Sequence, residues 1–143
     1  MNFALPFMIR PSGFCTAAAA LLLLLACHAP QKAQTPPGFV SWDKKKIELG
    51  PVKRGEKRAM TYEFTNTSGE NVQIDIVDAC ACTKVEFPRG VLEPGQKGRL
   101  EVTFDSSEKT AAETITINVI FKNTHANGVP RIEMLEYSFD LVQ

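Results

Sequence analysis

From Lys44 onward, apolar and polar residues alternate with a period of two, and this pattern constrains the fold more than any other feature of the chain. Successive side chains of a β-strand point to opposite faces, so such a segment turns one apolar face to a core and one polar face to water. The pattern is typical of antiparallel strands that pack on one side. It occurs in residues 47–49, 60–65, 72–76, 84–87, 100–105, 115–121 and 132–142.

In the last of these segments, the apolar residues change from even-numbered to odd-numbered positions. Met134 and Leu135 are adjacent apolar residues, and every second residue from Leu135 to Leu141 is apolar. Two adjacent apolar residues at such a change indicate a β-bulge, in which one strand carries an extra residue. We therefore expect a bulge at Met134 and Leu135.

Turn-forming stretches such as Asn66-Thr67-Ser68-Gly69 and Glu93-Pro94-Gly95 separate the alternating segments. About seven short strands at this spacing predict an all-β fold, an immunoglobulin-like antiparallel β-sandwich. A small barrel is the structural alternative, and the strand lengths do not decide between the two. No segment after residue 27 has the apolar stripe of a packed helix.

The N-terminus has the pattern of an export signal. Residues 17–26 form an apolar run of alanine and leucine, and Arg10 is the only basic residue before it. A membrane-spanning helix needs about 20 apolar residues, so this run is too short to span and fits the apolar region of a signal peptide. Pro6 interrupts the apolar start, and translation from Met8 instead of Met1 is therefore a second hypothesis.

The run ends in Leu24-Leu25-Ala26-Cys27, which resembles the lipobox of bacterial lipoproteins. In those proteins the cysteine is acylated and becomes the first residue after cleavage, so the resemblance implies a signal peptide over residues 1–26 and a membrane anchor at Cys27. His28 stands where an aspartate would retain the protein at the inner membrane of several diderm bacteria. This resemblance favours the outer membrane, facing either the periplasm or the surface. An ordinary signal peptide, which would leave Cys27 as a stray thiol, is the alternative.

Residues 27–38 contain three prolines and no hydrophobic periodicity. Pro-rich segments are extended and semi-rigid, so this stretch is expected to be a tether between the anchor and a domain over residues 39–143. Only one of the 16 basic residues and none of the 16 acidic residues precede Cys27, so the mature protein is nearly neutral. That balance gives no electrostatic reason to expect nucleic acid as a partner.

The segment from Tyr62 to Ser106 resembles a bacterial family of exported immunoglobulin-like domains of unknown function. The family pattern is an aromatic-rich strand, Asn-Thr-x-Gly, a strand of Ile and Val, Cys-Gly-Cys-Thr and Pro-Gly-x-x-Gly. The resemblance implies a sandwich related to hydin-type and major-sperm-protein-like domains, with an interaction role and no established activity. Ala81 replaces the glycine between the two cysteines. The matching residues are Phe64, Asn66, Thr67, Gly69, Cys80, Cys82, Thr83, Pro94, Gly95, Gly98 and Asp105.

Cys80 and Cys82 are the only ordinary thiols that remain after removal of the signal and acylation of Cys27. On an extended strand their Cα atoms would lie about 6.6 Å apart, so a disulfide requires a local bend. Such a bend could begin at Asp78 and Ala79, although alanine at position 81 closes a tight ring less easily than glycine does.

Several interpretations of the cysteine pair stay open. The two residues could be small buried thiols, a reducible disulfide favoured by an oxidising compartment, or a contact between molecules. They could also bind Cu(I) or Zn²⁺, with His125, Met60 or Met134 as a further ligand, or act in redox or nucleophilic chemistry.

No phosphate-binding loop, nucleophile elbow or paired metal motif is present in the sequence. We therefore expect a non-enzymatic protein-interaction or assembly module without a cofactor, anchored through Cys27 and bound to an envelope protein. The bend that contains Asp78, Ala79, Ala81 and Thr83 is the expected contact surface. A periplasmic metal-binding or thiol-redox protein that uses Cys80 and Cys82 is the alternative.

Overall fold

The computed structural model describes residues 38–142. The predicted signal peptide, the two alternative first residues Met1 and Met8, the predicted acylation site Cys27 and the expected tether up to residue 37 lie outside the described residues. Within the described part, no helix is long and apolar enough to cross a membrane.

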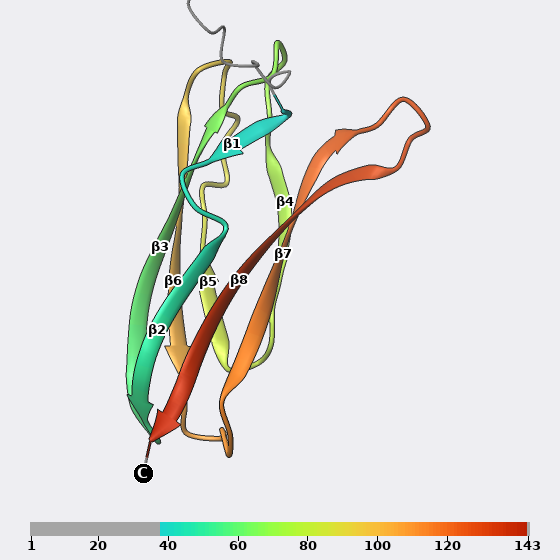
Figure 1. The fold of residues 1–143 in the computed structure, drawn as a ribbon. Helices are drawn as coiled ribbons and strands as arrows, with labels where there is room; N and C mark the ends of the chain where they lie inside the picture. The colour runs from blue at the N-terminus through green and yellow to red at the C-terminus, as the bar shows by residue number, and fades with distance from the viewer. Residues whose placement is uncertain (1–37, 143) are drawn as a thin grey trace, which may run out of the picture. The chain divides into compact units, whose positions relative to one another are not determined.

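The described residues form a sandwich of two four-stranded sheets, which confirms the predicted fold class (Figure 1). One sheet has the order β1-β3-β6-β5 and the other the order β2-β8-β7-β4. The strands are β1 (Val40–Trp42), β2 (Lys46–Lys53), β3 (Lys57–Asn66), β4 (Ile74–Asp78), β5 (Thr83–Glu86), β6 (Lys97–Asp105), β7 (Glu113–Thr124) and β8 (Pro130–Val142).

The first two strands belong to different sheets. β1 pairs antiparallel with β3, whereas β2 pairs with β8 in the only parallel pairing among the described strands. Residues 43–45 therefore carry the chain from one sheet to the other. This crossing connects both layers of the sandwich close to the start of the domain.

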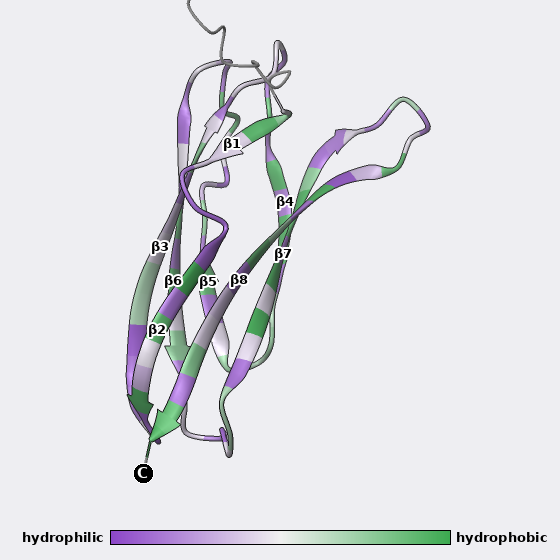
Figure 2. Cartoon of the chain, in the orientation of Figure 1, coloured by the Kyte–Doolittle hydropathy of each residue, from purple (hydrophilic) through white to green (hydrophobic). Residues whose placement is uncertain are grey.

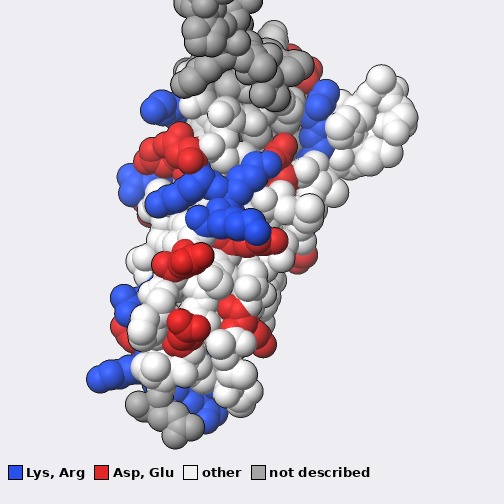
Figure 3. Space-filling view, viewed as in Figure 1, with Lys and Arg blue, Asp and Glu red and all other residues white. Residues whose placement is uncertain are grey.

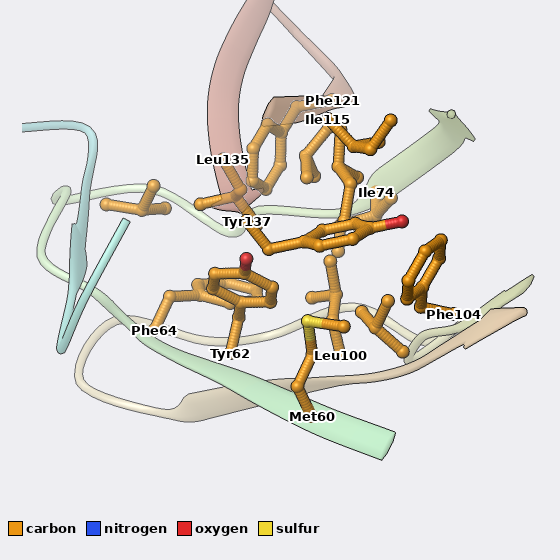
Figure 4. Close-up of a cluster of buried hydrophobic side chains, with 14 of the residues drawn as sticks. Met60, Tyr62, Phe64, Ile74, Leu100, Phe104, Ile115, Phe121, Leu135 and Tyr137 are labelled. Carbon is orange, nitrogen blue, oxygen red and sulfur yellow. The ribbon is translucent and has the colours of Figure 1, made fainter. Parts of the chain in front are cut away.

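Hydrophobic and hydrophilic residues alternate along the strands (Figure 2). The buried apolar side chains of both sheets form one core between the layers. Aromatic rings from both layers fill the centre, and the Tyr62 hydroxyl donates a hydrogen bond of 2.7 Å to the Glu136 carbonyl across the core. Figure 4 shows Met60, Tyr62, Phe64, Leu100 and Phe104 of one sheet against Ile74, Ile115, Phe121, Leu135 and Tyr137 of the other.

The expected bulge at Met134 and Leu135 is wrong. β8 pairs with β7 without interruption from Ile132 to Phe139, and Met134 and Leu135 face Asn118 and Ile117 in regular register. The parity changes because Leu135 points into the core, whereas Met134 points outward and is 63% exposed. The irregularity of this pairing lies farther along β7, between Ile120 and Thr124.

Ile132 points outward with Met134 and extends an apolar surface across three strands. It faces Ile120, which in turn faces Ile76 on β4. Ile76 is 55% exposed and Ile132 is 52% exposed. We call Ile76, Ile120 and Ile132 the isoleucine row.

The two ends of the sandwich carry different features. Val40, beside Gly38, pairs with Asn66 at the last residue of β3, and we call this the tether end. Lys57, the first residue of β3, pairs with Asp105, whose amide donates to the carbonyl of Cys82. The length of β3 separates the cysteines from the tether end by roughly 30 Å. We call their end the bend end.

Candidate functional site

The site is the bend that joins β4 to β5 and crosses from one sheet to the other. Two backbone hydrogen bonds fix its shape. The Thr83 amide donates to the Cys80 carbonyl at 2.8 Å, and the Asp105 amide donates to the Cys82 carbonyl at 2.9 Å. The first bond closes a turn around Ala81, and the second attaches that turn to the end of β6.

Cys80 and Cys82 are joined by a disulfide in the structure. The turn brings their Cα atoms to 5.2 Å, closer than the spacing of about 6.6 Å on an extended strand. The ring closes with Ala81 at its centre, although the family pattern that this segment resembles has glycine there. Both cysteines are half-buried and Ala81 is exposed, so the disulfide lies at the surface of the bend end.

A chain of hydroxyl groups connects the disulfide to the core. Thr83 Oγ1 lies 3.2 Å from Cys80 Sγ, 3.6 Å from Cys82 Sγ and 2.6 Å from the Tyr137 hydroxyl. Disulfide sulfurs carry no hydrogen, so the Thr83 hydroxyl is the donor to sulfur and its oxygen accepts from Tyr137. Burial raises the pKa of the Tyr137 phenol above its ordinary value, which keeps that donor protonated.

An open hollow of about 470 Å³ adjoins the disulfide. Hydrogen bonds from the hydroxyl and the amide of Ser107, together with the neighbouring Lys57, hold the pKa of the Asp105 carboxyl below its ordinary value. This wall of the hollow is therefore a carboxylate at neutral pH. The lining residues are Cys80, Ala81, Cys82, Asp105, Ser107, Glu108 and Lys109.

The predicted contact residues Asp78, Ala79, Ala81 and Thr83 lie together in the bend with both cysteines. His125 lies apart from them. It follows the last residue of β7, whereas the bend lies beside Tyr137, which pairs with Ile115 near the start of β7. Ten residues of strand correspond to roughly 30 Å, so His125 cannot share a metal ion with the cysteines.

The side chains of the other two proposed ligands are also directed away from the cysteine pair. Met60 is buried in the core and Met134 points outward from β8. Among the described residues, no group of three or more His, Cys, Asp and Glu side chains is arranged to hold a metal ion.

Sequence reasoning missed Tyr137 and the loop that follows β6. Tyr137 is 54 positions from Thr83, and its alternation with Leu135 and Phe139 identifies it only as a core residue. The threonine of Cys-x-Cys-Thr was the available signal, because a hydroxyl next to two cysteines can reach sulfur. The loop from Ser107 to Lys109 has no such signal, because the β-sheet pairing alone brings it to the cysteines.

Two sheets with the first two strands divided between them define an immunoglobulin-like sandwich of the PapD-like type. The structure is similar to the ASH/PapD-like domain 7 of human CEP192, with a TM-score of 0.60 and 14% identity over 82% of this chain and 96% of that chain. The chain belongs to the family described as "Protein of unknown function (DUF1573)", whose model matches residues 40–134. The expected family of unknown function with an immunoglobulin-like domain is thereby confirmed.

Other similar structures contain the fold as part of longer chains. A protein of unknown function from Porphyromonas gingivalis W83 gives a TM-score of 0.58 and 15% identity over 78% of this chain and 51% of that chain. The Vibrio cholerae VesB protease gives 0.58 and 18% over 71% of this chain and 32% of that chain. At these identities the likeness shows the fold alone. Comparison with curated proteins gives no match.

Proposed function

We propose that this chain is a lipid-anchored protein of the bacterial cell envelope whose sandwich is a non-enzymatic interaction module. Its partner is an envelope protein that adds an extended segment to β4. The observation that carries this proposal is the combination of an open β4 edge with the exposed isoleucine row beside it.

Among the edge strands longer than three residues, β4 alone lacks both lysine and proline. Lysine and proline on an edge discourage pairing with another chain, and β2 carries Lys46, Pro51 and Lys53. β5 carries Lys84, and β1 has only three residues. β4 contains neither lysine nor proline, so its free edge can accept a further strand through main-chain hydrogen bonds.

The side chains around β4 define the chemistry of that strand. Ile76, Ile120 and Ile132 lie side by side on the outer face and favour an apolar residue at the partner position opposite Ile76. Asp75 and Asp78 are the only charged residues of β4, and both are exposed. Asp78 shares the outer face with Ile76, so it favours lysine or arginine two positions along the partner from the apolar residue.

The charge distribution elsewhere supports a localised contact. On the visible face of the sandwich, basic and acidic side chains are interspersed, whereas the tip of the β7–β8 hairpin has no charged side chain (Figure 3). Such a mixed surface is soluble and non-adhesive. Against this mixed surface, the isoleucine row is a local apolar strip on the outer face of β4, β7 and β8.

The test is site-specific photocrosslinking in living cells. A photoreactive amino acid at position 75 is expected to give a discrete protein adduct, and Ile76→Lys in the same chain is expected to lower its yield at least tenfold. Val91, which is 53% exposed on the loop before β6, supplies the matched control. Val91→Lys should leave the adduct unchanged, and a crosslinker at position 91 should not form it.

Ile76→Lys must also leave the unfolding midpoint and the membrane attachment unchanged, because more than half of the side chain is in solvent. An adduct that persists in Ile76→Lys, or forms equally from position 91, would refute the placement at β4.

A further inference from the structure

We propose that the Cys80–Cys82 disulfide is a thiol–disulfide exchange site for a protein dithiol, in which the Thr83 hydroxyl stabilises Cys80 as the leaving thiolate. This activity goes beyond strand binding at β4 and does not depend on it. It rests on the surface position of the disulfide, the unequal contacts of Thr83 with the two sulfurs, and the adjoining hollow.

The unequal contacts determine which sulfur is attacked. In thiol–disulfide exchange a thiolate attacks one sulfur and the other sulfur leaves as a thiolate, and exchange is faster when the leaving thiolate is more stable. The Thr83 hydroxyl lies 0.4 Å closer to Cys80 Sγ, at 3.2 Å, than to Cys82 Sγ, at 3.6 Å. Charge that develops on Cys80 is therefore better stabilised, and Cys82 is the sulfur that is attacked.

Tyr137 strengthens this donor. Its hydroxyl donates to Thr83 Oγ1 at 2.6 Å, which leaves the Thr83 hydrogen free to point at sulfur. Hydrogen bonds in a chain polarise one another, so the Thr83 hydroxyl is a better donor than an isolated threonine. Since Tyr137 is fixed in the core, the donor is positioned before any thiol arrives.

The exchange balances with a dithiol as the reductant. A thiolate of the partner attacks Cys82 Sγ, the bond between the two sulfurs breaks, and the electron pair leaves on Cys80 Sγ. The second thiolate of the partner then attacks the partner sulfur of the mixed disulfide and releases Cys82 as a thiolate. The partner gains a disulfide and loses two electrons, and Cys80 and Cys82 gain those two electrons and take up protons from water.

The hollow gives an approaching chain access to the disulfide. It borders Cys80, Ala81 and Cys82 on one side and Ser107 to Lys109 on the other. At about 470 Å³ it accommodates a few side chains of a partner next to the reacting cysteine. Val40, near the start of the described residues, lies roughly 30 Å away at the other end of the sandwich.

The first test measures reduction of the mature full-length protein, purified from membranes in detergent without reductant, by dithiothreitol. Thr83→Val is expected to slow reduction about tenfold, because a hydrogen bond to a developing thiolate is lost. Thr83→Ser should restore the rate, and Thr103→Val, on an exposed neighbouring position of β6, should not change it. Equal rates for Thr83→Val and the unmodified protein would overturn the role of Thr83.

The second test measures the pKa of each thiol separately in the single-cysteine variants Cys80→Ser and Cys82→Ser. The pH dependence of iodoacetamide alkylation gives each thiol pKa, and Cys80 in Cys82→Ser is expected to have the lower value. Adding Thr83→Val to Cys82→Ser should raise the pKa of the Cys80 thiol. The opposite order, or free thiols in the protein before reduction, would overturn the proposal whether or not crosslinking at β4 succeeds.

Discussion

Gly98 lies where no larger residue fits. A Cβ atom at this position would lie 2.9 Å from Leu92 Cδ1 and closer still to the ring of Phe64, which packs on the backbone of β6. The matching Pro-Gly-x-x-Gly pattern identified this glycine from the sequence. It could not show that an aromatic ring from β3 excludes a methyl group, because that contact depends on the pairing of β3 with β6.

Gly98→Ala is expected to lower the free energy of unfolding by about 2–3 kcal/mol, because the ring of Phe64 must move within a packed core. Urea unfolding of the purified mature protein measures this change. Gly90→Ala is the matched control, since a Cβ atom there has no neighbour within 4 Å. Equal stability of the two variants would contradict the packing of Phe64 on β6.

Tyr62 makes the free energy of unfolding depend on pH in the alkaline range. Burial raises the pKa of its phenol above the unfolded value near 10, so the folded state retains the proton more strongly than the unfolded state does. The stabilisation is complete below about pH 10 and is lost as the pH rises toward the folded pKa. Tyr62→Phe should cost about 1 kcal/mol at pH 7, because the Glu136 carbonyl loses its donor, and should make the decline above pH 10 less steep.

Urea unfolding of the unmodified protein and Tyr62→Phe at pH 7, 10 and 11 tests this expectation. In Tyr62→Phe, the free energy of unfolding should still decline above pH 10, because burial also raises the pKa of Tyr137. Identical slopes above pH 10 would show that Tyr62 does not titrate differently in the two states.

At the scale of the strand, β8 shows what alternation can and cannot predict. The buried residues Leu135, Tyr137 and Phe139 follow the period of two, so their face was predictable. The outward direction of Ile132 and Met134 was not, because an apolar residue normally implies a buried face. A bulge was the locally consistent interpretation, and only the register with β7 excludes it.

The register of β8 predicts different effects for adjacent residues. Leu135→Ala should lower the free energy of unfolding by about 2–5 kcal/mol, because it leaves a cavity in the core. Met134→Ala should change it by less than about 0.5 kcal/mol, because that side chain is exposed. Chemical unfolding of both variants checks this, and similar losses would indicate a shifted register.

The parallel pairing of β2 with β8 also could not be predicted from the sequence. Strands in parallel and antiparallel pairs have the same side-chain period, so alternation does not reveal the direction of the partner. The crossing at residues 43–45 contains neither glycine nor proline. The two-sheet architecture was predictable, whereas the assignment of β1 and β2 to different sheets was not.

At the scale of the whole molecule, the lipobox resemblance predicts that acylation of Cys27 holds the domain at a membrane. Cys27→Ala is expected to abolish the acyl mass and to move the protein from the membrane to the soluble fraction, since the acyl chains supply the anchoring free energy. Intact mass spectrometry and fractionation measure both effects. Cys15→Ala, inside the predicted signal, is the control and should leave both unchanged. A membrane-bound Cys27→Ala protein would contradict the lipobox interpretation.

The placement of β1 has a mechanical consequence. The chain enters β1 at the tether end, and β1 lies antiparallel to β3, which begins at the bend end and runs back to the tether end. If a partner holds Cys82 while the N-terminus is fixed, tension acts along the strand axes and not across them. The β1–β3 hydrogen bonds then bear the force together in shear instead of opening one after another, and the crossing at residues 43–45 passes the remaining tension to β2 and the second sheet.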